Sequence, residues 1–203
     1  MTLTTAELAE VAELLGAAPD PALFESYRPR FNLPPTDPHM IVVGGDVKRL
    51  VPAHWAYGES KQINARAETA PRMGLYKRAF AERRCLVPAD GFYEWTGGKG
   101  KRQPVWFHAP PGELLTFAGL YDRDGGFVVI TVAANDELRP IHDRMPAILF
   151  GADRDAWLAR PDEKLLVPAA PGRLEKCLVS PRVNSVANDD PECLRGPDQL
   201  SLV

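Results

Sequence analysis

The amino-acid sequence predicts an α+β fold: a single compact domain of mainly antiparallel strands with a few short helices. Two observations lead to this prediction. Short apolar runs recur along the chain, and 20 prolines interrupt it, which strands joined by turns tolerate and long helices do not. A chain of 203 residues, 45% of them hydrophobic, can build one full core, so we assign residues 1–203 to one domain.

The first elements follow from local periodicity and from turn residues. Residues 5–17 predict a helix, with Thr5 as its N-cap and Gly16 as its end. Its apolar residues fall at helical spacing: Leu8, Val11, Ala12 and Leu15. Residues 40–52 are typical of a hairpin whose turn is the Gly-Gly-Asp sequence at 44–46.

The later elements alternate between strands and short helices. Residues 72–84 predict a second helix, and its apolar side consists of Leu75, Tyr76, Ala79 and Phe80. A last short helix is expected over residues 154–162. Strand-like runs separated by Gly, Pro and charged turns lie at 105–109, 114–122, 126–134 and 146–150.

Composition argues against several classes of protein. The first ten residues carry acidic but no basic side chains, and no apolar run approaches the roughly 20 residues that span a bilayer. We therefore expect a cytoplasmic protein without a membrane partner. The cysteines, Cys85, Cys177 and Cys193, have no metal-ligand or redox spacing, so we expect no metal, no cofactor and no disulfide. The net charge of −3 disfavours a protein that coats nucleic acid, so any DNA contact must be local.

Three polar stretches interrupt the apolar pattern. In the first, INARAET (63–69), an extended chain would place Asn64, Arg66 and Glu68 on one face, because side chains alternate with period two. That face could bind an anion through Arg66. A salt-bridged helix start explains the same residues equally well.

The second stretch, GFYEW (91–95), holds one carboxylate, Glu94, among three aromatic residues. Partial desolvation there would raise the pKa of Glu94 towards the range that is useful for proton transfer. On an alternating strand, however, Glu94 shares one face with Phe92, and the other two aromatic residues share the opposite face. The residues alone therefore favour a Glu94 that faces solvent.

The third stretch, IHDRMP (141–146), places His142 beside Asp143 and Arg144, between apolar segments. Histidine is the usual proton shuttle near neutral pH. A lone histidine next to an aspartate is more often a structural hydrogen-bond partner. Taken singly, none of the three stretches indicates an enzyme.

Taken together, the three stretches resemble the SRAP family, the SOS response-associated peptidases. INARAET, RRCLVPADGFYEW and IHDRMPAIL stand in the family's order, and RFNLPPT, LVPAHW and VSPRVNSVANDDPECL match further family segments. Long motifs in a fixed order are far more specific than a lone glycine pattern. The resemblance implies a compact α+β fold whose strands curl into a barrel-like core, with a groove for single-stranded DNA.

The resemblance also implies a chemistry. Family members bind an abasic site in single-stranded DNA. The ring-opened sugar aldehyde condenses with the α-amine of an N-terminal cysteine, and the thiol then closes a thiazolidine ring. At the matching positions, Glu94 is an acid/base beside that amine, His142 assists proton transfer to the sugar oxygen, and Asn64 positions the reacting groups.

For contacts with DNA, we expect charged side chains to bind phosphates and apolar side chains to contact the nucleotide. Arg66 and Arg144 would hold phosphates, because guanidinium groups form charge-assisted bonds to a backbone. Trp95 and Pro35 would supply apolar support around the displaced nucleotide.

The N-terminus departs from the family pattern. The family begins Met-Cys-Gly-Arg-aromatic, whereas this chain begins MTLTT, without that cysteine. An internal cysteine cannot replace it, since the ring needs an amine and a thiol on the same residue. Either the gene starts a few codons upstream of Met1, which we expect, or the chain is a variant that binds DNA without cross-linking it. In addition, Lys48 and Arg49 stand where the family has Trp-Gly, and Pro34 replaces an alanine.

Three functions therefore compete. The first is recognition of abasic sites in single-stranded DNA by a monomer, with covalent capture by the complete protein and without metal or cofactor. The second is a non-catalytic single-stranded DNA-binding module of the same fold. The third is a peptidase limited to removal of its own initiator methionine, because no Ser/His/Asp or internal Cys/His arrangement is evident for cleavage of other proteins.

Overall fold

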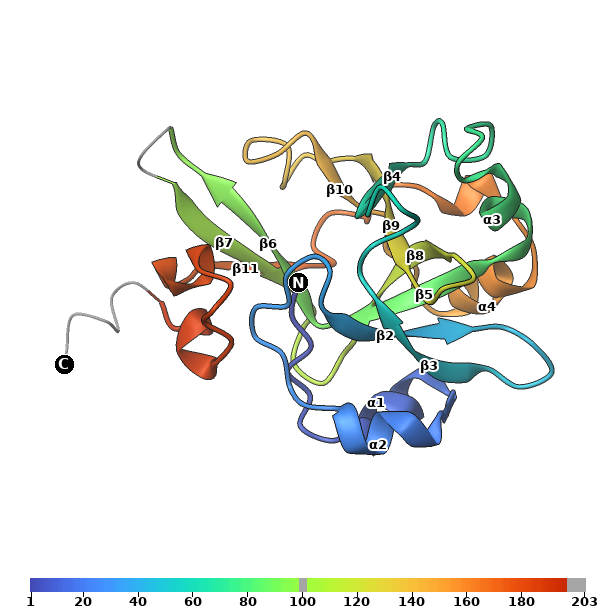
Figure 1. The fold of residues 1–203 in the computed structure, drawn as a ribbon. Coiled ribbons are helices and arrows are strands. Elements are labelled where there is room, and N and C mark those ends of the chain that lie inside the picture. The colour runs from blue at the N-terminus through green and yellow to red at the C-terminus, as the bar shows by residue number, and fades with distance from the viewer. Residues whose placement is uncertain (99–101, 197–203) are drawn as a thin grey trace.

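Strands covered on both faces form the centre of the computed structural model, which describes residues 1–98 and 102–196 (Figure 1). They are β5 (Arg84–Ala89), β8 (Leu115–Tyr121) and β9 (Phe127–Ala133). Nearly all of their side chains are buried. A strand buried on both faces needs a continuous apolar run, not an alternating one, and these segments have such runs.

A mixed sheet of eight strands contains this centre. Seven strands follow the order β1 (Ala18–Pro19), β3 (Arg49–His54), β2 (Pro38–Val43), β5, β8, β9 and β10 (Arg144–Pro146), and β4 (Asn64–Arg66) also pairs with β9. The β1–β3 and β4–β9 pairs are parallel, and the other pairs are antiparallel. A smaller antiparallel sheet has the order β11 (Glu175–Leu178), β7 (Gln103–His108) and β6 (Gly91–Thr96), and it extends from the larger sheet on the left of Figure 1.

Short helices lie outside the larger sheet. They are α1 (Leu8–Leu15), α2 (Pro21–Ser26), α3 (Lys77–Glu82), α4 (Ala152–Ala159) and the 3₁₀ helices η1 (Glu163–Leu165), η2 (Pro181–Asn184) and η3 (Pro191–Leu194). Gly16 ends α1 as predicted, with a left-handed φ of 58°, but the N-cap is Glu7 and not Thr5. Within the described ranges, no helix has the length and apolar character needed to cross a bilayer.

The structure confirms the α+β class, and within the described residues the large sheet does not form a closed barrel. In the part of the chain that the structure describes, β1 and β10 stand at the two ends of the strand order and do not pair with each other. β1 has two residues and β10 has three, and each strand ends at a proline, Pro19 or Pro146. The last residue of β3, His54, meets Gly126, the residue before β9, through an isolated parallel bridge.

The predicted hairpin is confirmed, since Val43 of β2 pairs with Arg49 of β3. The elements predicted over 72–84 and 146–150 are shorter than expected. The helix predicted over 72–84 spans only α3, after a series of turns that contains Gly74, a poor helix former. Of the strand predicted over 146–150, only the first residue belongs to β10, and the rest contacts β8 through an isolated bridge at Ile148.

His39 on β2 is a buried histidine. Its Nε2 atom lies 2.9 Å from the carbonyl oxygen of Pro88, and its ring packs against Phe127. Burial lowers the pKa of His39 from 6.5 to about 4. Below pH 6.5 the unfolded chain takes up a proton here, whereas the folded chain does so only near pH 4. The folded state therefore loses stability as the pH falls through this window.

We expect His39 to cost the protein about 2 kcal/mol of unfolding free energy between about pH 7 and pH 5, since one unit of pKa shift corresponds to about 1.4 kcal/mol. His39→Gln keeps an N–H donor for Pro88 and does not titrate, so its stability should depend less steeply on pH. Urea unfolding of both proteins across this range measures the difference. Equal pH dependence in the two proteins would contradict the assignment.

Candidate functional site

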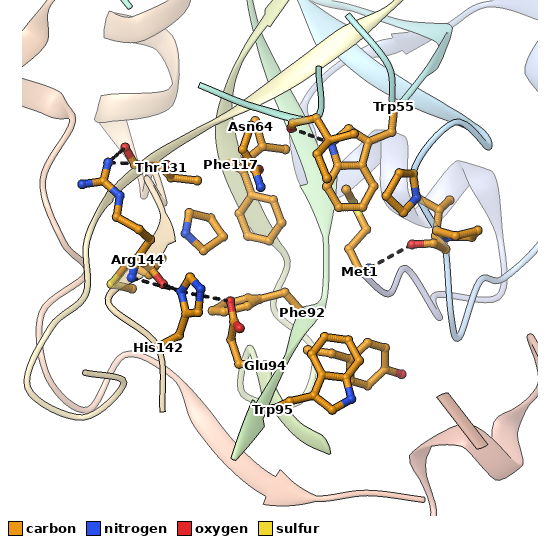
Figure 2. Close-up of a pocket in the computed structure, with 18 of the residues that line it drawn as sticks. Met1, Trp55, Asn64, Phe92, Glu94, Trp95, Phe117, Thr131, His142 and Arg144 are labelled. Atoms are coloured by element: carbon orange, nitrogen blue, oxygen red, sulfur yellow. Dashed lines mark hydrogen bonds and ion pairs between the residues drawn. The ribbon is translucent and has the colours of Figure 1, made fainter. Parts of the chain in front are cut away.

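A cavity of about 980 Å³ is lined by residues from both sheets (Figure 2). Among the described residues, no group of three or more His, Cys, Asp or Glu side chains is placed to hold a metal ion. The cavity lining includes every residue for which the sequence predicts a catalytic or DNA-binding role: Pro35, Asn64, Arg66, Glu94, Trp95, His142 and Arg144. The structure thus brings these residues together, and their roles stay predictions.

Strand β9 aligns the residues on one side of the cavity. β4 runs parallel to it, with Arg66 opposite Thr131, and β10 runs antiparallel, with Arg144 opposite Ala133. Because β4 is extended, Asn64 and Arg66 are exposed and the residue between them is buried, as predicted. This pairing excludes the alternative that a helix begins here.

Glu94 on β6 faces the cavity and not bulk solvent, which corrects the preference drawn from the residues alone. Its side chain is only 20% exposed, and its Oε1 atom lies 3.7 Å from Nδ1 of His142 (Figure 2). Desolvation raises the pKa of Glu94, the charge of His142 lowers it, and the charge of Asp143 raises it. The result is a carboxyl group that holds its proton at higher pH than an ordinary glutamate.

The His142 ring is oriented by the backbone of Arg144. Its Nδ1 atom lies 2.9 Å from the Arg144 carbonyl oxygen and 3.1 Å from the Arg144 amide nitrogen. The structural hydrogen bond that the sequence left open is therefore present. The ring is also half exposed at the cavity, so it is both held in place and accessible.

Arg144 already has an anionic partner. Its two terminal nitrogens lie 2.6 and 2.9 Å from the two carboxylate oxygens of Glu68, and one of them also donates to the carbonyl oxygen of Thr131 at 2.5 Å. This pairing holds the pKa of Glu68 below its usual value. Glu68 is thus salt-bridged, but to Arg144 on another strand and not within a helix start. A DNA phosphate at Arg144 would compete with this carboxylate.

Aromatic and apolar side chains complete the cavity wall. Trp55 donates from Nε1 to the Ile63 carbonyl oxygen at 2.8 Å, and Trp95 donates to Oδ1 of Asn184 at 2.7 Å. Val186 is exposed at the same wall. Sequence reasoning did not single out Trp55, Asn184 or Val186, although each lies in or beside a segment that matched the family motifs.

The C-terminal segment is held against this wall by Asp189. One Asp189 carboxylate oxygen accepts from the backbone N–H groups of Phe31 and Asn32 at 2.7 and 2.8 Å, and the other pairs with Arg30. The Asn32 side chain donates to three carbonyl groups of residues 183–188. Two segments about 150 positions apart in the sequence therefore form one wall.

The chain begins at the cavity. Met1 lines it, and the Met1 amine donates to the Leu33 carbonyl oxygen at 3.0 Å. Burial lowers the pKa of this amine from 8.0 to about 5, so most of it is neutral at pH 7. Asp90 fixes the residues that follow Met1, because its carboxylate accepts hydrogen bonds from Thr2 and Thr4.

Lys48 and Arg49, which differ from the family pattern, do not line the cavity. Lys48 pairs with Asp155, and Arg49 pairs with Asp20.

Sequence comparisons agree with the motifs. A family profile described as "SOS response associated peptidase (SRAP)" matches residues 1–186. The chain is similar to the abasic site processing protein YoaM of Bacillus subtilis (strain 168), with 34% identity over 86% of this chain and 88% of that protein. It is also similar to the abasic site processing protein HMCES of Gallus gallus, with 37% identity over 66% of this chain and 50% of that protein.

Solved structures show the same fold. A protein from Bacteroides thetaiotaomicron superposes with a TM-score of 0.79 at 21% identity, covering 96% of this chain and 98% of that chain. A phage-related protein from Bordetella bronchiseptica superposes with a TM-score of 0.67 at 27% identity, covering 88% and 92% of the two chains.

We expect the pKa of Glu94 to respond in opposite directions to changes in its two charged neighbours. His142→Gln removes the positive charge and should raise the pKa further, whereas Asp143→Asn removes a negative charge and should lower it. NMR titration of the side-chain carboxyl carbons measures both shifts without DNA. An unchanged pKa in both variants would show that desolvation alone governs Glu94.

Proposed function

Because the chain belongs to the SOS response associated peptidase (SRAP) family, we propose that it recognises and processes abasic sites in single-stranded DNA. The observation that carries the proposal is the gathering of Asn64, Glu94 and His142 around one cavity that also holds basic and aromatic side chains. Relatives that cover most of the chain are abasic site processing proteins, which supports the same substrate.

In the proposed complex, the DNA backbone runs past Arg66 while the lesion enters the cavity. Arg66 is exposed on β4 and lines the cavity, so it can form a charge-assisted bond to a phosphate. Trp95 and Pro35 give apolar surface to the nucleotides beside the lesion. The net charge of −3 suits a protein that reads one lesion better than a protein that coats a strand.

The proposed reaction begins with attack of a neutral N-terminal amine on the aldehyde carbon of the opened sugar. The C–N bond forms, the carbonyl oxygen becomes a hydroxyl group, and loss of that hydroxyl as water leaves an imine. Glu94, with its raised pKa, donates the proton for the departure of water, and His142 carries protons to and from the sugar oxygen. Asn64 offers both a donor and an acceptor to hold the sugar.

The fate of the imine depends on the N-terminal residue. A terminal cysteine traps it, because the thiol adds to the imine carbon, the imine nitrogen takes up the proton and a five-membered ring closes. Met1 has an amine but no thiol, so its imine stays open to hydrolysis. In this proposal, covalent capture belongs to a protein that begins with cysteine.

We therefore expect the chain that begins at Met1 to form no heat-stable adduct with abasic single-stranded DNA. A version in which Cys-Gly-Arg and an aromatic residue replace Met1, with the cysteine terminal, should form one. Denaturing gels of labelled oligonucleotides compare the two. Glu94→Gln in the extended protein should slow the reaction, since proton donation to the departing water is lost.

Two controls separate the competing functions. Serine in place of the added cysteine keeps the amine and removes the thiol, so it should abolish the heat-stable adduct. Borohydride reduces an imine to a stable amine, and trapping of the Met1 chain by borohydride would distinguish reversible chemistry from a non-catalytic binding module. A heat-stable adduct from the Met1 chain without borohydride would overturn the proposed chemistry.

We also expect Arg66→Ala to weaken binding of single-stranded DNA and to reduce the dependence of log K on log salt by about 0.7, the value for one phosphate contact on a single strand. Fluorescence titrations over a range of salt concentrations measure this slope. Arg78→Ala is the matched control, because Arg78 is exposed on α3 and is absent from the cavity lining. Equal slopes for Arg66→Ala and wild type would place the strand elsewhere.

A further inference from the structure

The Glu68 carboxylate occupies the position on Arg144 that a DNA phosphate would take. It binds both terminal nitrogens of the guanidinium, at 2.6 and 2.9 Å. Carboxylate and phosphate groups fit the same planar fork of donors, each in a bidentate manner. Glu68 itself does not line the cavity, whereas Arg144 does.

The two partners differ in how firmly they are held. The Arg144 side chain is 18% exposed, lies on β10 and also donates to the carbonyl oxygen of Thr131 on β9. The Glu68 side chain is 56% exposed and follows β4. Exposed ion pairs are weak, because water solvates the released carboxylate well. Glu68 is therefore the partner that can leave, while Arg144 stays in place.

Pairing with Glu68 reduces the positive charge at the cavity that is available to bind DNA. Arg144 lowers the pKa of Glu68, so this carboxylate is ionised at neutral pH and cancels one of the two positive charges of Arg66 and Arg144. A loosely bound DNA strand gains little binding free energy by displacing the Glu68 carboxylate from Arg144. A strand anchored by its lesion in the cavity presents its phosphates at a high effective concentration, which favours the exchange.

We propose that Glu68 competes with DNA phosphates for Arg144 and so weakens binding of single-stranded DNA, undamaged strands included. This inference rests on the proposed function, because it presumes that DNA lies along the cavity. When an abasic strand binds, a phosphate replaces the carboxylate on the Arg144 fork, and Glu68 turns to water.

Glu68→Gln tests this competition in the whole chain. The variant should bind undamaged single-stranded oligonucleotides roughly two- to fivefold more tightly than wild type, as the loss of a weak competing ion pair implies. Its salt slope on undamaged DNA should steepen by about 0.7, the value for one added phosphate contact. Its affinity for abasic oligonucleotides should rise by at least the same factor, because abasic strands must displace this carboxylate in the wild type.

Glu82→Gln is the matched control. It removes the same charge from the ion pairs that Glu82 of α3 makes with Arg78 and Arg83. Both arginines are absent from the cavity lining, so the affinity and slope of this variant should equal those of wild type. The gain in Glu68→Gln should disappear in the double variant Glu68→Gln/Arg144→Ala, because the freed fork is then absent. Circular dichroism establishes that each variant is folded.

The outcomes separate the inference from the function on which it rests. If the wild-type chain binds DNA but Glu68→Gln has the same salt slope as wild type, the inference fails and the proposed function stands. Weaker binding by Glu68→Gln also overturns it, because Glu68 would then serve to position Arg144. If the wild-type chain binds neither undamaged nor abasic single strands, both the proposed function and the inference fail.

Discussion

The candidate site depends on one strand, β9, that pairs along both of its edges. The Val129 N–H and the Thr131 carbonyl group bond to the segment that contains β4, while the Ile130 carbonyl group accepts from the residue that follows β10. Alternate residues of a strand direct their hydrogen-bonding groups to opposite edges. β4 and β10 are therefore locked on either side of β9, and the ion pair of Arg144 with Glu68 crosses it.

The opposite wall of the cavity is formed by the small sheet and the C-terminal segment. β6 belongs to the small antiparallel sheet, and the C-terminal segment packs beside it through the bond between Trp95 and Asn184. That segment is held by Asp189, which pairs with the buried Arg30 and accepts two backbone N–H groups. A buried charge of this kind is costly unless it is fully paired, so the network also specifies how the two ends of the chain meet.

Charge in the site is tuned by burial and by pairing. Desolvation raises the pKa of Glu94 and lowers the pKa of the Met1 amine, so both groups are neutral over more of the pH range than in water. The Arg144 guanidinium keeps its charge but shares it with Glu68. The cavity thus combines a carboxyl group and an amine whose charged forms are disfavoured with a cationic face of limited strength, which fits the modest net charge of the chain.

The sequence by itself determined the α+β class, the hairpin at 40–52 and seven of the residues that line the cavity, because periodicity, turn residues and long ordered motifs are local signals. It did not determine that Glu94 faces the cavity. Nor did it show which anion holds Arg144. Those features arise from pairings between segments far apart in the chain, and the burial and charge of a side chain are set by whatever those pairings bring beside it.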